Sequence, residues 1–410
     1  SSEGDTIGTT DINEIYAEVD VPLLTDMTLA ESVGINASYR VSDDKFFGSE
    51  DTWRVTAHWD FTDWIRLRGT AGTSFRAPNL MELFIAEQTG FEDAFIDPCI
   101  IPTDTDERSQ TVIDNCISEG IDPFTFGAGG APSVPTVSGG ADDLRPETSD
   151  SWSVGAVFTQ PWFDGFDFQM SIDLTDIEIT NAVAEPDAGF ILNQCYTSPN
   201  FSDPLCDRVT RNLAAPPASR FLLEVDESVA NIEVENFQDV SFSTLLSKDF
   251  SAGERFVNFS WNADFTRLLD LEEGLFVETV DDLVGAIDAP EWQIQSTETL
   301  TFGNWSVLHR GYYRSSGRDT AQQLADQASL EGDVTSISSF HTHSFSVSYE
   351  GDSWRAFLTL ENAFDAEPDL IDDVAFGSNS INNLPLGVYP TEAIMGRTII
   401  FSVRKTLGGV

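Results

Sequence analysis

Basic residues are scarce in this sequence. Lysine and arginine together number 21 against 69 aspartates and glutamates, which gives a formal net charge of −48 over 410 residues. Nucleic acid is bound through basic patches, so this balance argues against nucleic acid as a partner. Chains with such charge are often disordered, but 30 phenylalanines and 9 tryptophans supply ample apolar surface for a folded protein. The acidity suits a surface outside the cell.

Long apolar runs are missing as well. No stretch reaches 18 apolar residues, which argues against a transmembrane helix. The opening residues, SSEGDTIGTTD, contain neither a basic nor an apolar region and are not a signal peptide. We therefore expect that a leader has been removed or that the chain begins partway through something longer.

Recognisable catalytic motifs are also lacking. The sequence has no G-x-S-x-G, P-loop or H-E-x-x-H pattern. Its four histidines, His58, His309, His341 and His343, lie in strand-like segments. The last two share an apparently outward face, which favours an interfacial position over metal binding. The sequence therefore predicts that the protein is not an enzyme.

Cysteine is rare, and its four copies fall into two local pairs in polar, proline-containing stretches. We predict disulfide bonds between Cys99 and Cys116 and between Cys195 and Cys206, although four cysteines allow three connectivities. Closing a loop of this size is worth about 3 kcal/mol in the chain-entropy model. The absence of C-x-x-C argues against zinc, and the pairs indicate an oxidising compartment.

Alternation of apolar and polar residues dominates the rest of the chain. In residues 65–76 the odd positions are apolar or small, whereas the even positions carry Arg66, Arg68 and Arg76. Such alternation predicts β-strands with two unlike faces. About fourteen segments of this kind, many long enough to cross a bilayer when tilted, start near residues 12, 27, 52, 64, 148, 164, 218, 237, 254, 291, 304, 336, 353 and 395.

The connections between these segments alternate between short and long. Tight turns are expected at 25–28, 61–64, 163–165 and 351–353, and long loops near 78–146, 183–217, 267–290, 315–335 and 365–391. Tryptophans cluster at the segment ends, as in the aromatic girdles of membrane proteins. Both features predict an antiparallel transmembrane β-barrel with short periplasmic turns and long extracellular loops.

Several stretches resemble, in order, those of the TonB-dependent outer-membrane receptors. SFRAPNLMELF (74–84) is similar to the family's FRAPNL-type motif, and LRPETSDSWSVGAVF (144–158) to its PE-S-x-x-x-G strand. FQMSIDLTDIEITNAV (168–183), LENAFD (360–365) and GRTIIFSVRKTL (396–407) resemble later strands and the last hairpin. The resemblance covers essentially the whole chain.

The resemblance implies an all-β barrel in the outer membrane of a Gram-negative bacterium, in contact with lipid and lipopolysaccharide. Its function would be active import of a nutrient such as an oligosaccharide, a peptide or a metal chelate, driven by TonB through a plug. Arg66, Arg68 and Arg76 would face the lumen, where a plug could offer carboxylates. Because side chains alternate between the two faces of a strand, the sequence also predicts which residues face lipid and which face the lumen. Lipid-facing residues would include Leu67, Phe259, Trp261, Phe345 and Leu358, and lumen-facing ones Asn262, Ser346 and Glu361.

The chain departs from the family pattern at both ends. Family barrels have 22 strands and a preceding plug, whereas about 14 strands and no plug are expected here, and the chain ends on KTLGGV rather than on an aromatic residue. We therefore expect residues 1–410 to be the C-terminal portion of a barrel, with the plug and the first strands in a preceding segment or a separate chain. The strand near 12–24 should then lack a partner on one side.

The ligand is not specified by any motif. Aromatic residues of the long loops are the candidates for stacking on a sugar or a flat chelate: Phe91, Phe95, Phe124, Phe126, Tyr196 and Phe201. Acidic loops repel anions, which slightly favours an oligosaccharide or peptide over a ferric siderophore. Ca²⁺ could bind the acidic run 103–108 or the Asp pairs at 142–143, 281–282 and 372–373, although solvated loop charge explains them equally. The alternatives are a secreted carbohydrate-binding or polysaccharide-degrading domain and a passive porin.

Overall fold

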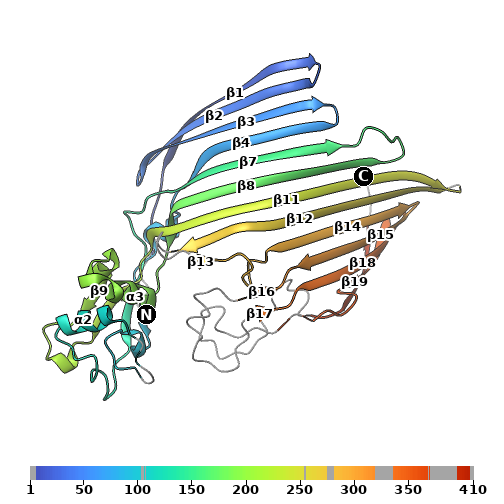
Figure 1. Cartoon of the computed structure of the whole chain (residues 1–410). Coiled ribbons are helices and arrows are strands. Elements are labelled where there is room, and N and C mark those ends of the chain that lie inside the picture. The colour runs from blue at the N-terminus through green and yellow to red at the C-terminus, as the bar shows by residue number, and fades with distance from the viewer. Residues whose placement is uncertain are drawn as a thin grey trace.

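One large antiparallel sheet dominates the molecule, which is described here from a computed structural model (Figure 1). The structure describes residues 6–102, 106, 108–253, 255–274, 281–318, 336–367, 369 and 395–406. The sheet has 14 strands, and neighbours in the sheet follow one another in the chain. Its strands are β1 (Ile12–Met27), β2 (Ala30–Asp44), β3 (Gly48–Thr62), β4 (Ile65–Arg76), β7 (Glu147–Thr159), β8 (Asp167–Ala184), β11 (Ala230–Ala252), β12 (Arg255–Gly274), β13 (Asp281–Asp282), β14 (Trp292–Phe302), β15 (Trp305–Arg314), β18 (Phe340–Glu350), β19 (Trp354–Glu361) and β20 (Thr398–Lys405).

The predicted all-β fold and the predicted number of strands are confirmed, but one predicted strand lies outside the large sheet and a strand that was not predicted lies in it. The segment expected near residue 218 becomes β10 (Leu222–Asp226), which belongs to a smaller sheet. The fourteenth strand is instead β13, whose two residues pair with the end of β12. The short turns expected at 61–64, 163–165 and 351–353 are present, whereas β1 continues to Met27 and places the first turn at 28–29 rather than 25–28. Gly253 and Gly303 each adopt a positive φ at two further short turns, a conformation that glycine enters without steric cost.

The sheet is open. Among the described residues β1 pairs only with β2 and β20 only with β19, so the sheet does not close into a ring on itself. The prediction that the first strand lacks a partner on one side is therefore confirmed. Both edges present unpaired backbone groups along their length.

The two faces of the sheet differ in chemistry, as the alternation predicted. The strand register shows which residues share a face. Following the paired residues from strand to strand places Leu67 of β4, Ile172 of β8, Phe259 of β12 and Leu358 of β19 on the same face of the sheet. We call this the apolar face. The opposite face carries Arg66, Arg68 and most of the polar side chains, and we call it the polar face. All of the predicted lipid-facing residues lie on the first and all of the predicted lumen-facing residues on the second.

The loops between β4 and β7 and between β8 and β11 combine into one compact unit at one end of the sheet, which we call the lobe (Figure 1). A small sheet with the order β5-β6-β10-β9 joins them, since two of its strands come from each loop. The strands are β5 (Gln88–Glu92), β6 (Val134–Ser138), β9 (Val209–Arg211) and β10. The helices of the two loops are α1 (Leu80–Phe84), η1 (Ala94–Ile96), α2 (Gln110–Ser118), α3 (Ala188–Thr197), η2 (Pro199–Phe201), η3 (Pro204–Arg208) and η4 (Pro217–Ser219). Two more short strands, β16 (Gly317–Arg318) and β17 (Ser336–Ile337), pair with each other.

Local sequence explains where the lobe helices start. Ser109 and Asp187 are N-caps whose side chains accept hydrogen bonds from the backbone N–H groups of Val112 and Phe190, which satisfies donors that the first helical turn leaves free. Each helix buries one side in the lobe core, including Val112 and Ile191. No helix in the described part of the chain has the length and apolar character needed to span a membrane.

Candidate functional site

A ladder of ion pairs lies on the polar face. Arg68 contacts Asp173 at 2.6 Å, Arg66 pairs with Asp60, and Arg76 pairs with Glu147 and with Glu82. We expected a plug to offer carboxylates to these arginines. Each guanidinium already has a carboxylate partner within this chain, most of them on the adjacent strand or on the next strand but one. The wall thus supplies carboxylates itself, and a further contact with a plug stays a prediction.

Two other arginines of the polar face differ from this ladder. Arg54 on β3 and Arg310 on β15 form no ion pair with a described residue, and both side chains are exposed. An unpaired guanidinium presents several N–H donors to whatever lies against the wall. Arg54 and Arg310, like Arg404 on β20, are therefore cations that the described part of the wall can offer to a ligand.

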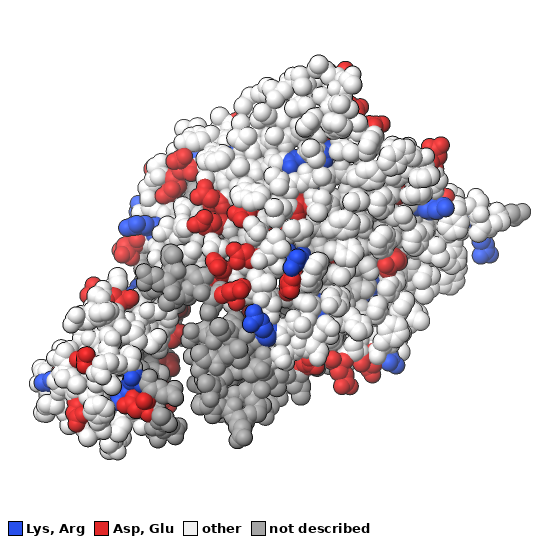
Figure 2. All heavy atoms as spheres, in the orientation of Figure 1, with Lys and Arg blue, Asp and Glu red and all other residues white. Residues whose placement is uncertain are grey.

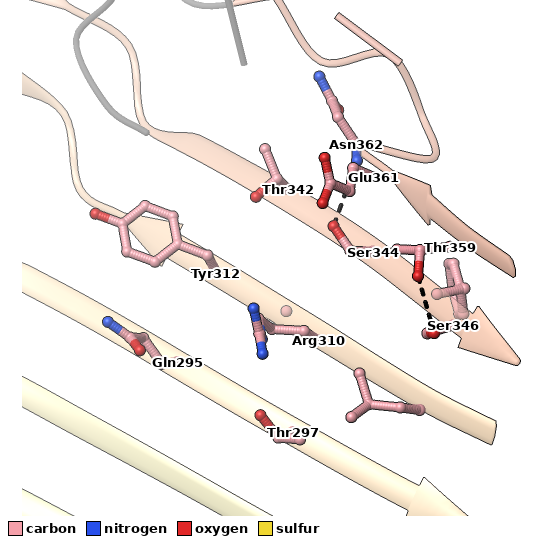
Figure 3. Close-up of a pocket in the computed structure, with 13 residues that line it drawn as sticks. Gln295, Thr297, Arg310, Tyr312, Thr342, Ser344, Ser346, Thr359, Glu361 and Asn362 are labelled. Carbon is pink, nitrogen blue, oxygen red and sulfur yellow. Dashed lines mark hydrogen bonds between the residues drawn. The ribbon is translucent and has the colours of Figure 1, made fainter. Parts of the chain in front are cut away.

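Arg310 stands in a pocket of about 550 Å³ on the polar face (Figure 3). Four neighbouring strands line it, with Arg310 and Tyr312 from β15 and Glu361 from the end of β19. The rest of the lining is mostly short and polar: Gln295, Thr297, Thr342, Ser344, Ser346, Thr359 and Asn362. Hydrogen bonds hold the rim, since Ser346 and Thr359 are 2.9 Å apart and the Asn362 N–H donates to Ser344 at 3.3 Å.

This pocket can bind a polar ligand. Arg310 supplies a cation, Glu361 a carboxylate, and the hydroxyl groups can donate or accept. Acidic side chains elsewhere gather over the strand ends nearest the lobe on the face seen in Figure 2. Arg310, which has no ion pair within the described ranges, thus provides a local positive charge in an acidic protein.

Both predicted disulfide bonds are present in the lobe. Cys99 bonds with Cys116 and Cys195 with Cys206, and the described chain has no free cysteine. The first pair joins α2 to the turn that follows η1, and the second joins α3 to η3. All four sulfurs lie within the lobe core or against it.

A buried polar network joins the two loops of the lobe. Arg211 donates two hydrogen bonds to Asp97, at 2.8 and 2.7 Å, across 114 residues of sequence. It also donates to the Tyr196 hydroxyl at 2.7 Å, which in turn donates to Glu119 at 2.8 Å. Burial raises the pKa of the Glu119 carboxyl although Arg211 lies beside it, and burial likewise raises the pKa of Tyr196.

The six candidate ligand-binding aromatics divide into two groups. Phe91, Phe95 and Phe124 are exposed on the lobe surface and are free to contact a ligand. Phe126 and Tyr196 are buried in the lobe core, and Phe201 packs edge-on against Tyr196 with ring centroids 5.2 Å apart. Phe201 is only half-buried and stays a prediction. The prediction is corrected for Phe126 and Tyr196, because a ring that completes a core has no face left for a ligand.

Sequence reasoning missed why these rings are buried. It treated the long loops as irregular, whereas α2 and α3 give them a core of their own. The capping residues Ser109 and Asp187 were the available signal. For the suggested Ca²⁺ sites, the described residues contain no group of three or more acidic, histidine or cysteine side chains arranged to hold a metal. Most of the run 103–108 and the pair at 372–373 lie outside the described residues.

The fold and its two faces define a segment of a membrane β-barrel wall. A family model for the TonB-dependent receptor-like β-barrel matches residues 2–363, and the chain belongs to that family. Its barrel lies in the outer membrane, with the apolar face toward lipid and the polar face lining the lumen. The predicted location is thereby confirmed.

Solved structures of receptors share this fold. One is a mutant of the ferric enterobactin receptor PfeA from Pseudomonas aeruginosa, with 14% identity, a TM-score of 0.58, and coverage of 96% of this chain and 44% of that chain. Another is the siderophore receptor PirA from Acinetobacter baumannii, with 16% identity, a TM-score of 0.57, and coverage of 96% and 45%. The chain thus spans less than half the length of the structures that it matches.

The lipid-facing assignment can be tested with adjacent residues of β8. Ile172 lies on the apolar face with 48% of its surface exposed, whereas Ser171 faces the lumen. Arginine near the middle of the lipid band costs about 2–4 kcal/mol, so we expect that loss for Ile172→Arg and much less for Ser171→Arg. Denaturant unfolding of the complete receptor in lipid vesicles measures both. Equal losses would contradict the assignment.

Proposed function

We propose that this chain forms part of the wall of a TonB-dependent importer of iron chelates. The matched structures, a ferric enterobactin receptor and a siderophore receptor, support an iron chelate as the class of substrate. In this proposal a preceding segment supplies the plug and the strands that pair with β1 and β20. TonB then acts on the plug from the periplasm, and the wall performs no bond chemistry.

The observation that carries the choice of substrate is the pocket around Arg310. Ferric complexes of oxygen ligands commonly carry negative charge, and an unpaired guanidinium in a partly enclosed site favours an anion. Glu361 and the surrounding hydroxyl groups can contact the polar periphery of the same ligand. The acidic lobe repels anions, whereas the pocket around Arg310 attracts them. A chelate of low net negative charge is therefore expected, because it is attracted by the pocket and only weakly repelled by the lobe.

We expect Arg310→Ala to weaken chelate binding by about tenfold or more, because a hydrogen bond to a charged group contributes roughly 1.5–3 kcal/mol. The measurement is binding and uptake of iron-55 chelates by the complete receptor in outer membranes. Arg267→Ala is the matched control, since Arg267 lies on the apolar face beside Trp292 and Glu291. An equal effect of both variants would argue against the pocket.

An oligosaccharide is the second candidate, and the exposed rings of Phe91, Phe95 and Phe124 favour it because aromatic faces stack on sugars. The same assay distinguishes the two classes. If the receptor binds a neutral oligosaccharide, loses that binding when these rings are removed, and binds no chelate, the iron-chelate proposal is wrong and the oligosaccharide takes its place.

A further inference from the structure

A row of polar side chains crosses the apolar face on β14, β15 and β18. The His309 Nδ1 atom hydrogen-bonds with Glu298, and its Nε2 atom lies 3.0 Å from Nδ1 of His343. The side chains of Glu298 and His309 are 30% and 27% exposed. We call Glu298, His309 and His343 the polar row.

The polar row lies at a depth where lipid is expected. Glu298 and His309 face each other in the register of β14 and β15, midway between Trp292 at one end and Trp305 at the other. Exposed tryptophans at both strand ends mark the two membrane interfaces. On β3, β4 and β7 the middle of the strand carries only small or apolar outward residues, namely Val55, Ala57, Leu67, Gly69, Ala71, Val154 and Ala156.

Net neutrality decides how the protons are arranged. Charge is unfavourable in hydrocarbon, so the row is best held with a single proton shared between Glu298 and His309. His309 then donates from Nε2 to Nδ1 of His343, which leaves an N–H donor on Nε2 of His343. One end of the row is therefore a carboxylate acceptor and the other end is an imidazole donor.

A row with unlike ends is complementary to itself. Two copies inserted in the same direction in one membrane can be related by a two-fold axis along the membrane normal, and such an axis makes an isologous contact. This axis places the Glu298 end of one copy opposite the His343 end of the other. We propose that the apolar face of β14, β15 and β18 is the docking surface for a second copy of the receptor. The two polar rows pair there and are removed from lipid.

Cysteine cross-linking of the complete receptor in the outer membrane tests this proposal. Ser296 precedes Glu298 by two residues on the same face, and the four natural cysteines are already bonded. With a bifunctional maleimide, Ser296→Cys should give an adduct of twice the receptor mass. Ile172→Cys, which is also outward-facing, should give none. No adduct at position 296, or an adduct of another mass, would overturn the proposal in favour of lipid or of a different protein.

A second pair of variants tests the polar row itself. Glu298→Leu and His309→Leu replace polar groups by apolar ones on a lipid-facing surface, so each variant should still insert and keep its heat-modifiable migration on gels. In the Ser296→Cys background each should lower the cross-linked fraction at least tenfold. A dimer that persists in both variants would show that the row does not hold the copies together.

Discussion

Replacing Arg211 with methionine should lower the free energy of unfolding of the lobe by about 3–5 kcal/mol, because it leaves the buried Asp97 carboxylate without its partner. The lobe should then unfold locally. The side chains of Arg211 and Asp97 are each only 2% exposed. The substitution also removes the donor to the Tyr196 hydroxyl and the ion pair with Glu119, whose atoms are 3.0 Å apart. Hydrogen exchange of the lobe measures the loss, with the strands of the large sheet as an internal reference.

Two further variants show whether the buried charge is the cause. Arg145→Met is the control, since Arg145 is an exposed arginine beside the lobe whose side chain makes no hydrogen bond or ion pair with a described residue. Adding Asp97→Leu to Arg211→Met should recover much of the lost stability, because it removes the more deeply buried of the two carboxylates, Asp97 and Glu119, that lose their arginine. If the double variant is as unstable as Arg211→Met, the buried charge is not the reason for the loss.

Removing either disulfide bond should destabilise the lobe by about 3 kcal/mol in the chain-entropy model. The bonds close loops with sequence separations of 17 and 11 residues. Cys99→Ala with Cys116→Ala, and Cys195→Ala with Cys206→Ala, remove them one at a time. Limited proteolysis should then cut the lobe faster, whereas the large sheet should keep its heat-modifiable migration on gels.

Chemical reduction provides the independent check. Dithiothreitol should sensitise the natural receptor to protease in the lobe and should have no effect on a variant that lacks all four cysteines. A reduced lobe that resists protease as well as the oxidised one would mean that the core formed around Ile191 and Val225 holds the two loops without the bonds.

Most of the wall could be predicted from the sequence because its signal is local. A strand exposed to lipid on one face and to a wet lumen on the other must alternate at every residue. The face of each residue, from Leu67 to Leu358, follows from that alternation alone. The disulfide pairs were equally local, since each joins cysteines fewer than 20 residues apart.

The lobe and the partners of the charged residues could not be predicted in this way. Arg211 and Asp97 are 114 residues apart, and the partner of Arg68 is 105 residues away on β8. Nothing in the neighbouring sequence indicates which carboxylate each arginine meets. The same holds for Tyr196, whose burial depends on helices from two loops that pack together only in the folded chain.

By itself the sequence determined the all-β class, the two faces of each strand, the two disulfide bonds and the membrane setting, because period-2 patterning and short loops act over a few residues. Only the tertiary structure decided four further features. It joined two loops into one lobe, paired the lumen arginines with carboxylates of the same chain, placed Arg310 in a pocket without an ion-pair partner among the described residues, and aligned Glu298 with two histidines in the lipid band. Those features depend on which strands and loops become neighbours, and contacts between distant segments leave no periodic trace in the chain.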